Sequence, residues 1–220
     1  MAIDETRTRL LQAAGVEFAE KGFEGATVRA ICDRAGVNLA AVNYHFGDKE
    51  RLYEEVVMLA HRQRAEPDFD PTVGDPRHSL RNYVAHFVHQ LVAIRELPWH
   101  QEVMLREIAL PSKASEKLVD EAFRPDFEVL MAILRRLCPE ADGRQIHAIG
   151  FSVIAQCLHY KICAPISERI IGPEAFKRLD ADYLVEHITR FTLSALGHGE
   201  PLTVANHNSA DASAGPTDRG

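Results

Sequence analysis

The sequence predicts an all-α protein, and three observations support this fold class. Apolar residues recur at helical spacing through most of the 220 residues. Capping residues, glycines and prolines separate one helical pattern from the next. No stretch alternates apolar and polar residues as a half-buried strand does. We therefore expect an N-terminal three-helix unit with a connecting helix, followed by a larger helical bundle.

Four helices are predicted within residues 1–62. The first carries an apolar stripe and ends near Gly22, because glycine suits a left-handed C-cap. The next three are expected at 28–35, at 39–46 and from residue 49 onward. Each of these is preceded by a residue that caps helices well: Thr27, Asn38 and Asp48.

A second group of helices is predicted within residues 76–197. A loop separates it from the first group, because residues 66–76 contain three prolines and a glycine. Helical patterns then cover about 77–96, 98–110, 114–137, 142–164 and 180–197. Pro125 predicts a kink or a break in the third of these helices. Small and polar residues dominate 198–220, which we expect to form a disordered tail.

Composition excludes several classes of protein. The net charge is -7, so bulk positive charge is not available to coat nucleic acid. No apolar run reaches the ~18 residues of a membrane helix, and the N-terminus has no secretory signal. The four cysteines show no zinc-like spacing, and we expect them to be reduced packing residues. We therefore expect a cytoplasmic protein without membrane partners, and no motif indicates an enzyme or a cofactor.

Residues 27–46, TVRAICDRAGVNLAAVNYHF, predict two short helices around a glycine-containing turn. This pattern is typical of a helix-turn-helix, in which the second helix enters the major groove of DNA. Its small residues permit close approach to the bases, and Asn43 suits an adenine edge. The alternative is a plain helical hairpin inside a core. The candidate DNA-contacting residues are Thr27, Leu39, Ala40, Ala41, Asn43, Tyr44, His45 and Lys49.

Residues 6–57 closely resemble the DNA-binding domain of TetR/AcrR-family regulators, above all in AAGVEFAEKGFEGATVRAICDRAGV and AVNYHFGDKERLY. The resemblance implies a homodimeric, ligand-responsive transcription factor. It also implies that Thr27, Tyr44 and Lys49 touch phosphates while the rest of the candidate set faces bases. One departure concerns residues 38–41, which are Asn-Leu-Ala-Ala where many members carry Ser-Lys-Gly-Thr-like residues. An operator therefore does not transfer from better-known members.

Residues 100–172 resemble the C-terminal domain of the CecR-type branch, which suggests control of export or drug-tolerance genes. We expect the last two long helices to form a dimer interface, the alternative being monomer core. A ligand pocket is expected between helices, where bundles hold ligands, although each candidate also suits ordinary core packing. The candidate pocket residues are Trp99, Met104, Phe127, Met131, Gln156, His159 and Tyr160. Arg106 and Glu107 add charge there, either solvated or paired together.

The sequence thus predicts a ligand-responsive regulator, a repressor, that binds a palindromic operator as a homodimer. The partners expected are double-stranded operator DNA, a second copy of the chain and a small-molecule effector. One alternative is a helical small-molecule-binding or scaffold protein that has lost specific DNA reading. Another is a small helical enzyme that uses His86, His89 or His159. We expect no metal, because His86 and His89 are i, i+3 on one helix without a visible third ligand.

Overall fold

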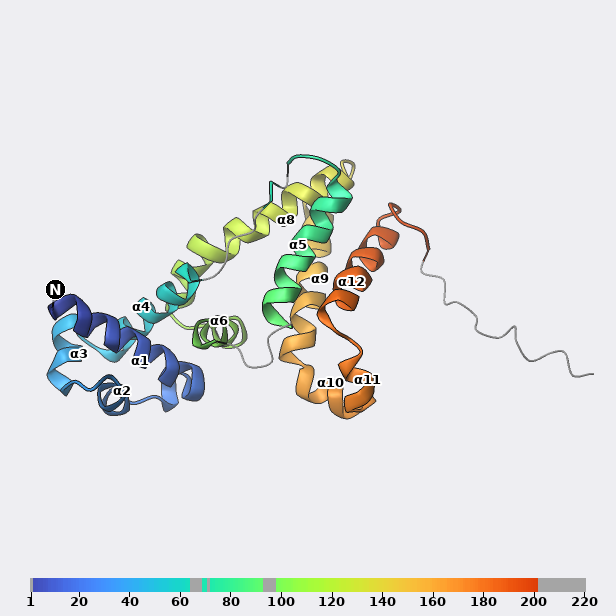
Figure 1. Cartoon of the computed structure of the whole chain (residues 1–220). Helices are drawn as coiled ribbons and strands as arrows, with labels where there is room; N and C mark the ends of the chain where they lie inside the picture. The colour runs from blue at the N-terminus through green and yellow to red at the C-terminus, as the bar shows by residue number, and fades with distance from the viewer. Residues whose placement is uncertain (1, 64–68, 71, 93–97, 202–220) are drawn as a thin grey trace, which may run out of the picture.

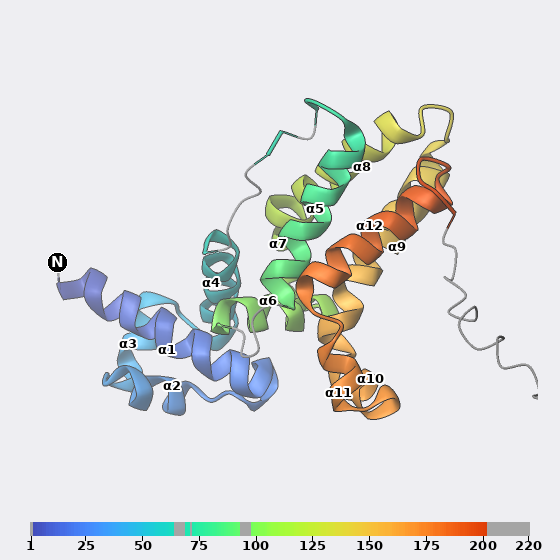
Figure 2. The same ribbon diagram turned by 45° about the vertical axis from the view of Figure 1, so that its right-hand side comes forward.

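The computed structural model describes residues 2–63, 69–70, 72–92 and 98–201, and within them it contains helices and no strand. The predicted all-α class is therefore confirmed. Figures 1 and 2 show two groups of helices, with α1–α4 in one and α5, α8, α9 and α12 in the other. No single described helix is both long and apolar enough to cross a membrane. Helices α9 and α10 reach that length and hydropathy only together, across a bend of 74°.

The N-terminal helices begin and end close to their predicted positions. They are α1 (Ala2–Gly25), α2 (Val28–Ala35), α3 (Leu39–His45) and α4 (Lys49–Arg62). The side chains of Thr27, Asn38 and Asp48 each accept a hydrogen bond from a backbone N–H three residues later, at 3.1, 3.1 and 2.8 Å. Gly22 has a φ of 70°, which glycine adopts readily, but its ψ of 175° is not that of the predicted left-handed C-cap, and α1 resumes beyond this kink as far as Gly25.

The C-terminal helices include two that the sequence did not predict. The predicted ones are α5 (Pro76–Leu91), α6 (Trp99–Ala109), α7 (Ala114–Leu118), α8 (Arg124–Leu137), α9 (Gly143–Ile162) and α12 (Ala181–Ala195). The additional ones are α10 (Ala164–Ile171) and α11 (Pro173–Lys177). Each of these two carries a proline in its first turn, where proline favours a helix rather than ending one. Of the predicted tail, residues 202–220 lie outside the described part of the chain.

Pro125 does not break the helix that contains it. Helices α7 and α8 are joined by a π-helical turn, η1 (Val119–Phe123), in which the Arg124 N–H donates to the Val119 carbonyl. Proline has no N–H to donate four residues back, and its ring crowds the carbonyl at that position. The wider turn accommodates both effects, so the helix continues with one altered turn instead of an end.

The buried apolar residues form two cores that do not follow chain order. The first core lies among α1–α4 and also takes Val103 and Met104 from α6, with Leu118 from α7 and Ala122 from η1. The second core lies among α5, α8, α9 and α12. Helix α6 thus packs against the N-terminal helices, and α7–η1–α8 runs from the first core into the second (Figure 1).

Candidate nucleic-acid interface

Helices α2 and α3 form a helix-turn-helix whose turn is fixed by backbone geometry. Gly36 has a φ of 65°, a conformation that side chains with a Cβ rarely adopt. The Gly36 N–H donates to the Asp33 carbonyl at 3.3 Å, and the Val37 N–H donates to the Cys32 carbonyl at 3.0 Å. Four buried apolar residues hold the two helices in the first core: Ile31, Ala35, Val42 and Phe46.

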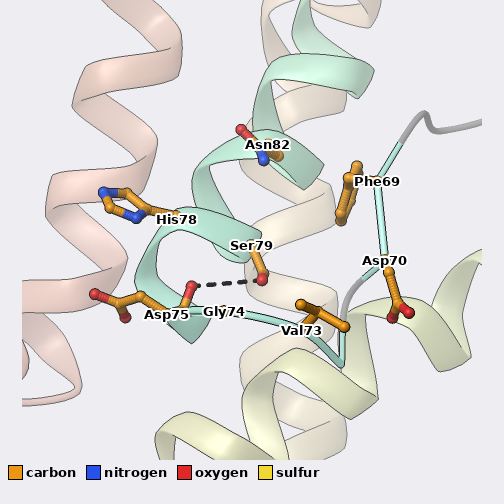
Figure 3. Close-up of a pocket in the computed structure, with 8 residues that line it drawn as sticks. All are labelled: Phe69, Asp70, Val73, Gly74, Asp75, His78, Ser79 and Asn82. Atoms are coloured by element: carbon orange, nitrogen blue, oxygen red, sulfur yellow. Dashed lines mark hydrogen bonds between the residues drawn. The ribbon is translucent and has the colours of Figure 1, made fainter.

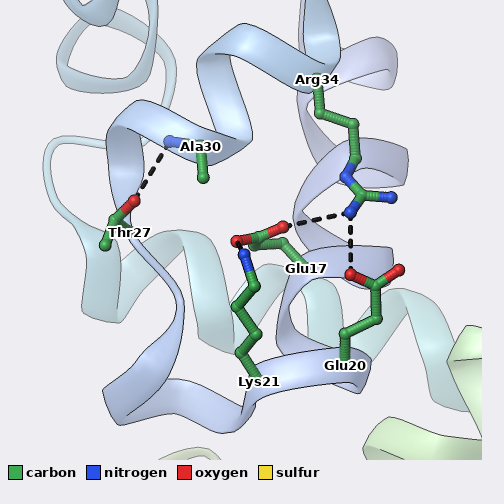
Figure 4. Close-up of polar contacts among 6 residues, drawn as sticks. All are labelled: Glu17, Glu20, Lys21, Thr27, Ala30 and Arg34. Carbon is green, nitrogen blue, oxygen red and sulfur yellow. Dashed lines mark hydrogen bonds and ion pairs between the residues drawn. The ribbon is translucent and has the colours of Figure 1, made fainter.

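A buried charge network fastens α2 to α1 (Figure 4). The Glu17 carboxylate is 1 % exposed and receives an ion pair from Lys21 and another from Arg34 at 3.2 Å. Arg34 also reaches Glu20 at 2.8 Å. The hydrogen bond from Lys21 and the nearby Arg34 hold the pKa of Glu17 below its usual value, against the effect of burial. Because both partners are present, the buried carboxylate is compensated.

The end of α2 receives a second fastening from α1. The Arg9 guanidinium donates to the carbonyls of Ala35 and Gly36, the latter at 3.2 Å. The last carbonyls of a helix lack partners within the helix, and a cation there also favours the helix dipole. The angle between α1 and the helix-turn-helix is therefore set by polar contacts as well as by the core.

The outer face of α3 is open to solvent. Leu39 is 53 % exposed and Tyr44 is 74 % exposed, and Ala40 and Asn43 are also exposed. His45 is half-buried, with its ring set edge-on to that of Tyr44 at 5.0 Å between centroids. Ala41 is half-buried as well and packs against the first core, so its methyl group is less accessible than predicted.

Two predicted phosphate contacts flank α3, and both have an intramolecular contact already. The Thr27 hydroxyl accepts from the Ala30 N–H at 3.1 Å, so its oxygen serves as the cap of α2 (Figure 4). The Lys49 ammonium lies 4.6 Å from the centre of the Phe23 ring, an attractive cation–π contact that fixes the side chain. Arg29, which is not among the residues predicted from the sequence, is exposed in the first turn of α2, two residues after the cap.

Helix α6 is attached to α1 by side-chain hydrogen bonds. The Arg106 guanidinium donates to the Ala19 carbonyl at 2.8 Å and to the Glu20 carbonyl at 3.3 Å. The Trp99 indole N–H donates to the Gln12 side chain at 3.1 Å. One interpretation of the sequence paired Arg106 with its neighbour Glu107, but the Arg106 guanidinium bonds these two carbonyls of α1 instead.

A buried carboxyl group joins α6 to α4. Glu107 is 2 % exposed and accepts a hydrogen bond from the Tyr53 hydroxyl at 2.6 Å. Its other oxygen accepts from the Ser112 N–H at 3.3 Å, from the Ser112 hydroxyl at 3.1 Å and from the Ser115 hydroxyl at 2.5 Å. Burial and the adjacent Glu107 hold the pKa of Tyr53 well above its usual range, so this hydroxyl stays a donor. Glu107 is thus a structural link, not a solvated charge.

The residues predicted to line a ligand pocket fall into two groups. Trp99 and Met104 pack on the first core, whereas Phe127, Met131 and Tyr160 belong to the second. The remaining two are on α9: the Gln156 amide donates to the Ser152 carbonyl at 3.2 Å, and exposed His159 contacts the Ser167 hydroxyl at 3.3 Å. Sequence spacing does not reveal this division, because α6 could pack against either group of helices.

Two adjoining cavities lie along the outer side of α5 instead. One has a volume of about 350 Å³ and is lined by residues of the 69–75 segment and of α5 (Figure 3). The other has about 410 Å³, and the two share Phe69 and Asn82. His86 and His89 line the second cavity; His86 contacts Gln90 at 3.0 Å, and His89 lies 3.5 Å from the Asp182 carboxylate.

Helices α9 and α12 present exposed aromatic residues. Tyr183, His187 and Phe191 form a ladder along α12, with ring centroids 6.0 and 6.2 Å apart. Tyr183 is 52 % exposed and Phe191 is 45 % exposed, and Phe151 of α9 is 61 % exposed. Only part of the apolar surface of α12 is therefore open to a partner, because Leu184 and Ile188 are buried in the second core.

Both halves of the chain match models of known protein families. Residues 10–56 match the model described as bacterial regulatory proteins, tetR family. Residues 76–196 match the C-terminal domain of the helix-turn-helix-type transcriptional dual regulator CecR. Together the two matches cover α2, α3 and α5–α12 and the greater part of α1 and α4, and they agree with both resemblances found in the sequence.

Individual relatives and solved structures agree with the family models. The chain is 31 % identical over 104 residues to the transcriptional regulator UidR of Escherichia coli K12, covering 47 % of this chain and 50 % of UidR. The alignment thus spans only about half the length of that relative. The hemolysin II regulator HlyIIR is 25 % identical with a TM-score of 0.59, covering 85 % and 98 % of the two chains. The TetR-family regulator PfmR of Thermus thermophilus is 25 % identical with a TM-score of 0.60, covering 84 % and 94 %.

Proposed function

Because this chain belongs to the TetR family of bacterial transcriptional regulators and carries a CecR-type C-terminal domain, we propose that it represses transcription as a homodimer. The dimer binds a palindromic operator in the cytoplasm and is released by a small-molecule effector. A DNA-binding regulator is what the family and its named relatives have in common. Beyond this shared role, we propose that the chain forms a homodimer, that its operator is palindromic and that a small molecule releases it.

The exposed face of α3 is the observation that carries this proposal. Asn43 presents an amide that suits the edge of an adenine, and exposed Ala40 offers little side chain to obstruct approach to the groove. In this proposal Tyr44 and Lys49, with Arg29 of α2, contact phosphates on either side of the groove. Such contacts fix the register of the protein on the duplex.

Charge explains why two copies are needed. Residues 1–62 contain eight Lys and Arg against ten Asp and Glu, so this unit carries a net charge of -2. Non-specific attraction to DNA is therefore weak, and affinity must come from a few placed contacts made twice. Two-fold symmetry provides this when the two α3 helices lie ~34 Å apart, one turn of the duplex.

The second copy is proposed to cover the aromatic residues of α9 and α12. Tyr183, Phe191 and Phe151 are large apolar side chains on neighbouring helices, and the described residues of one chain leave each of them exposed. An isologous dimer buries the same surface on both subunits. It also places the two helix-turn-helix units symmetrically with respect to one axis, as a palindrome requires.

The effector is proposed to bind among the C-terminal helices and to favour the state that does not fit the operator. A ligand with equal affinity for both states would not change DNA binding. Phe127, Gln156 and Tyr160 remain the proposed lining residues; all three are half-buried, so a ligand there requires side chains of the second core to move. The opposite preference of the ligand would make the protein an activator.

Selection of genomic fragments on the purified protein at physiological salt tests the proposal. An enriched inverted repeat is the expected result. No enrichment, with or without cell extract as a source of effector, would overturn specific DNA reading and favour the alternative, a helical ligand-binding or scaffold protein.

Variants then test the contacts. Tyr44→Ala and Lys49→Ala should weaken operator binding, and losing one phosphate contact per subunit should lower the salt slope by ~1.8 per dimer. Asn43→Ala should change base preference more than the salt slope. Lys177→Ala, an exposed lysine at the end of α11, is the matched control and should leave both unchanged. Unchanged affinity in the Tyr44 and Lys49 variants would contradict the assignment.

A further inference from the structure

Helices α6 and α7 pack against α1 and α4, not against the helices that follow them in the chain. Extensive helix contacts fall into two sets, one of α1–α4 with α6 and α7, the other of α5 with α8–α12. Contacts between described helices of different sets are slight, apart from the junction of η1 with α8. We call the first set body 1 and the second set body 2.

Side-chain bonds reinforce body 1. Trp99 and Arg106 bond α6 to α1, and Tyr53 of α4 bonds Glu107 of α6. The Lys113 ammonium before α7 pairs with Glu50 of α4 at 2.8 Å. These bonds come from four positions spread over α6 and the start of α7, so they oppose sliding and rotation of α6 on the N-terminal helices. We expect α6 and α7 to follow the N-terminal helices in any motion.

The chain changes from one body to the other three times: between α4 and α5, between α5 and α6, and at about residues 123–127. The last is helical throughout and lies wholly within the described residues. Leu118 and Ala122 are in the core of body 1, and Leu130 and Leu134 are in the core of body 2. The seam between the bodies therefore lies at the C-terminal end of the π-turn η1, at Pro125.

The π-turn is also the mechanically weakest part of this helix. Pro125 supplies no backbone N–H, so the helix lacks one regular hydrogen bond there. Kinks in helices concentrate at prolines and π-bulges because the backbone ladder is already interrupted. On the exposed side Arg124 and Asp120 form an ion pair at 3.1 Å, a surface contact worth little energetically.

We propose that η1 and Pro125 form a hinge, about which body 1 moves as a unit relative to body 2. The moving unit therefore includes α6 and α7, so an effector that repacks body 2 acts on the helix-turn-helix through the 119–125 segment. The inference rests on the proposed function for its regulatory meaning. The hinge itself concerns the free protein and is tested there.

Distances between spin labels in the free dimer test the hinge. Labels are attached through an introduced unnatural amino acid to avoid the four cysteines, and labelled chain is diluted with unlabelled chain to one label pair per dimer. One pair joins Glu116 of α7 to Glu24 of α1, within body 1. The other joins Glu116 to Arg144 of α9, across the seam; all three positions are exposed. We expect a narrow distribution of label-to-label distances for the first pair and a broad distribution for the second.

The variant Pro125→Ala restores a backbone donor at the seam. Its distribution for the Glu116–Arg144 pair should narrow, and hydrogen exchange of the amides of 119–124 should slow by up to roughly tenfold, the effect of one added hydrogen bond. The matched control Pro173→Ala, at the start of α11, should change neither. When operator DNA is added to wild type, only the Glu116–Arg144 distance should shift.

Two results would overturn the hinge. One is a broad or shifting Glu24–Glu116 distance with a fixed Glu116–Arg144 distance, which would place α6 and α7 with body 2. The other is a Pro125→Ala protein whose distances and exchange match those of wild type. Failure to find an operator would refute the proposed function but would leave these measurements on the free protein interpretable.

Discussion

Replacing Tyr53 by phenylalanine should loosen the junction between α4 and α6. The substitution removes only the hydroxyl that donates to Glu107 at 2.6 Å. The ring keeps its packing, with centroids 4.8 Å from Phe18 and 5.1 Å from Phe23. The change therefore creates almost no cavity, and the effect measured is that of one hydrogen bond.

The size of the effect follows from burial. Tyr53 is 5 % exposed and Glu107 is 2 % exposed, so water cannot readily replace the lost donor. Ser112 and Ser115 both donate to Glu107 Oε2, whereas Tyr53 donates to Oε1. In the variant Oε1 therefore loses the hydroxyl that donates to it. A buried hydrogen bond to a charged group contributes ~1.5–3 kcal/mol, and we expect the free energy of unfolding to fall by that amount. For a chain of this size the midpoint of thermal unfolding should fall by roughly 3–12 °C.

Urea unfolding and operator titration are the assays. Unfolding is measured at one fixed protein concentration, because association stabilises a dimer by mass action. Tyr44→Phe is the matched control, since its hydroxyl is on a side chain that is 74 % exposed, and its stability should stay that of wild type. If the free energy of unfolding of Tyr53→Phe lies within about 0.5 kcal/mol of the wild-type value and operator affinity is unchanged, the structural role given to Glu107 is refuted.

Three further substitutions have equally direct outcomes. Phe191→Glu should shift the chain from dimer to monomer in sedimentation experiments while Phe191→Leu should not; a stable Glu variant dimer would contradict the proposed interface. The folded protein lowers the pKa of Glu17, so the ionised carboxylate stabilises the fold at pH values above its ordinary pKa of 4.5, and this contribution is lost as the pH falls below 4.5. The Glu17→Gln protein should therefore have a smaller free energy of unfolding at neutral pH and a weaker dependence of that free energy on acidic pH. A pH dependence of stability equal to that of wild type would count against the network. Gly15→Ala would place a Cβ 2.5 Å from the Trp99 ring and should destabilise the fold by ~1–3 kcal/mol, with partial rescue by Trp99→Leu; an unaffected Gly15→Ala would show that α6 is not tightly docked.

The elements that the sequence predicted correctly depend on local chemistry. Thr27, Asn38 and Asp48 cap their helices because each side chain bonds a backbone N–H three residues away. Gly36 turns the chain because its backbone conformation suits few other residues. The exposed face of α3 follows from helical periodicity once its buried face is known. All of these signals lie within a few residues of the feature that they specify.

Helices α10 and α11 show the limit of local signals. The predicted helical pattern ends just before Pro165 and no predicted pattern includes Pro173, yet each proline lies in the first turn of a new short helix. Proline is compatible both with the end of one helix and with the start of another. Pro125 is a third case, because the helix around it continues through a π-turn.

The sequence by itself determined the helical class, the helix-turn-helix and the face of α3 directed outward, because capping, turn chemistry and periodicity act over short distances. Tertiary structure alone decided that α6 packs with the N-terminal helices, that Glu107 is buried beside Tyr53 and that the predicted pocket residues separate between two cores. The side-chain hydrogen bonds that join α6 to α1 and α4 connect residues 54 or more positions apart, whereas the amphipathic pattern of a helix indicates that it has a buried face but not which helix covers that face.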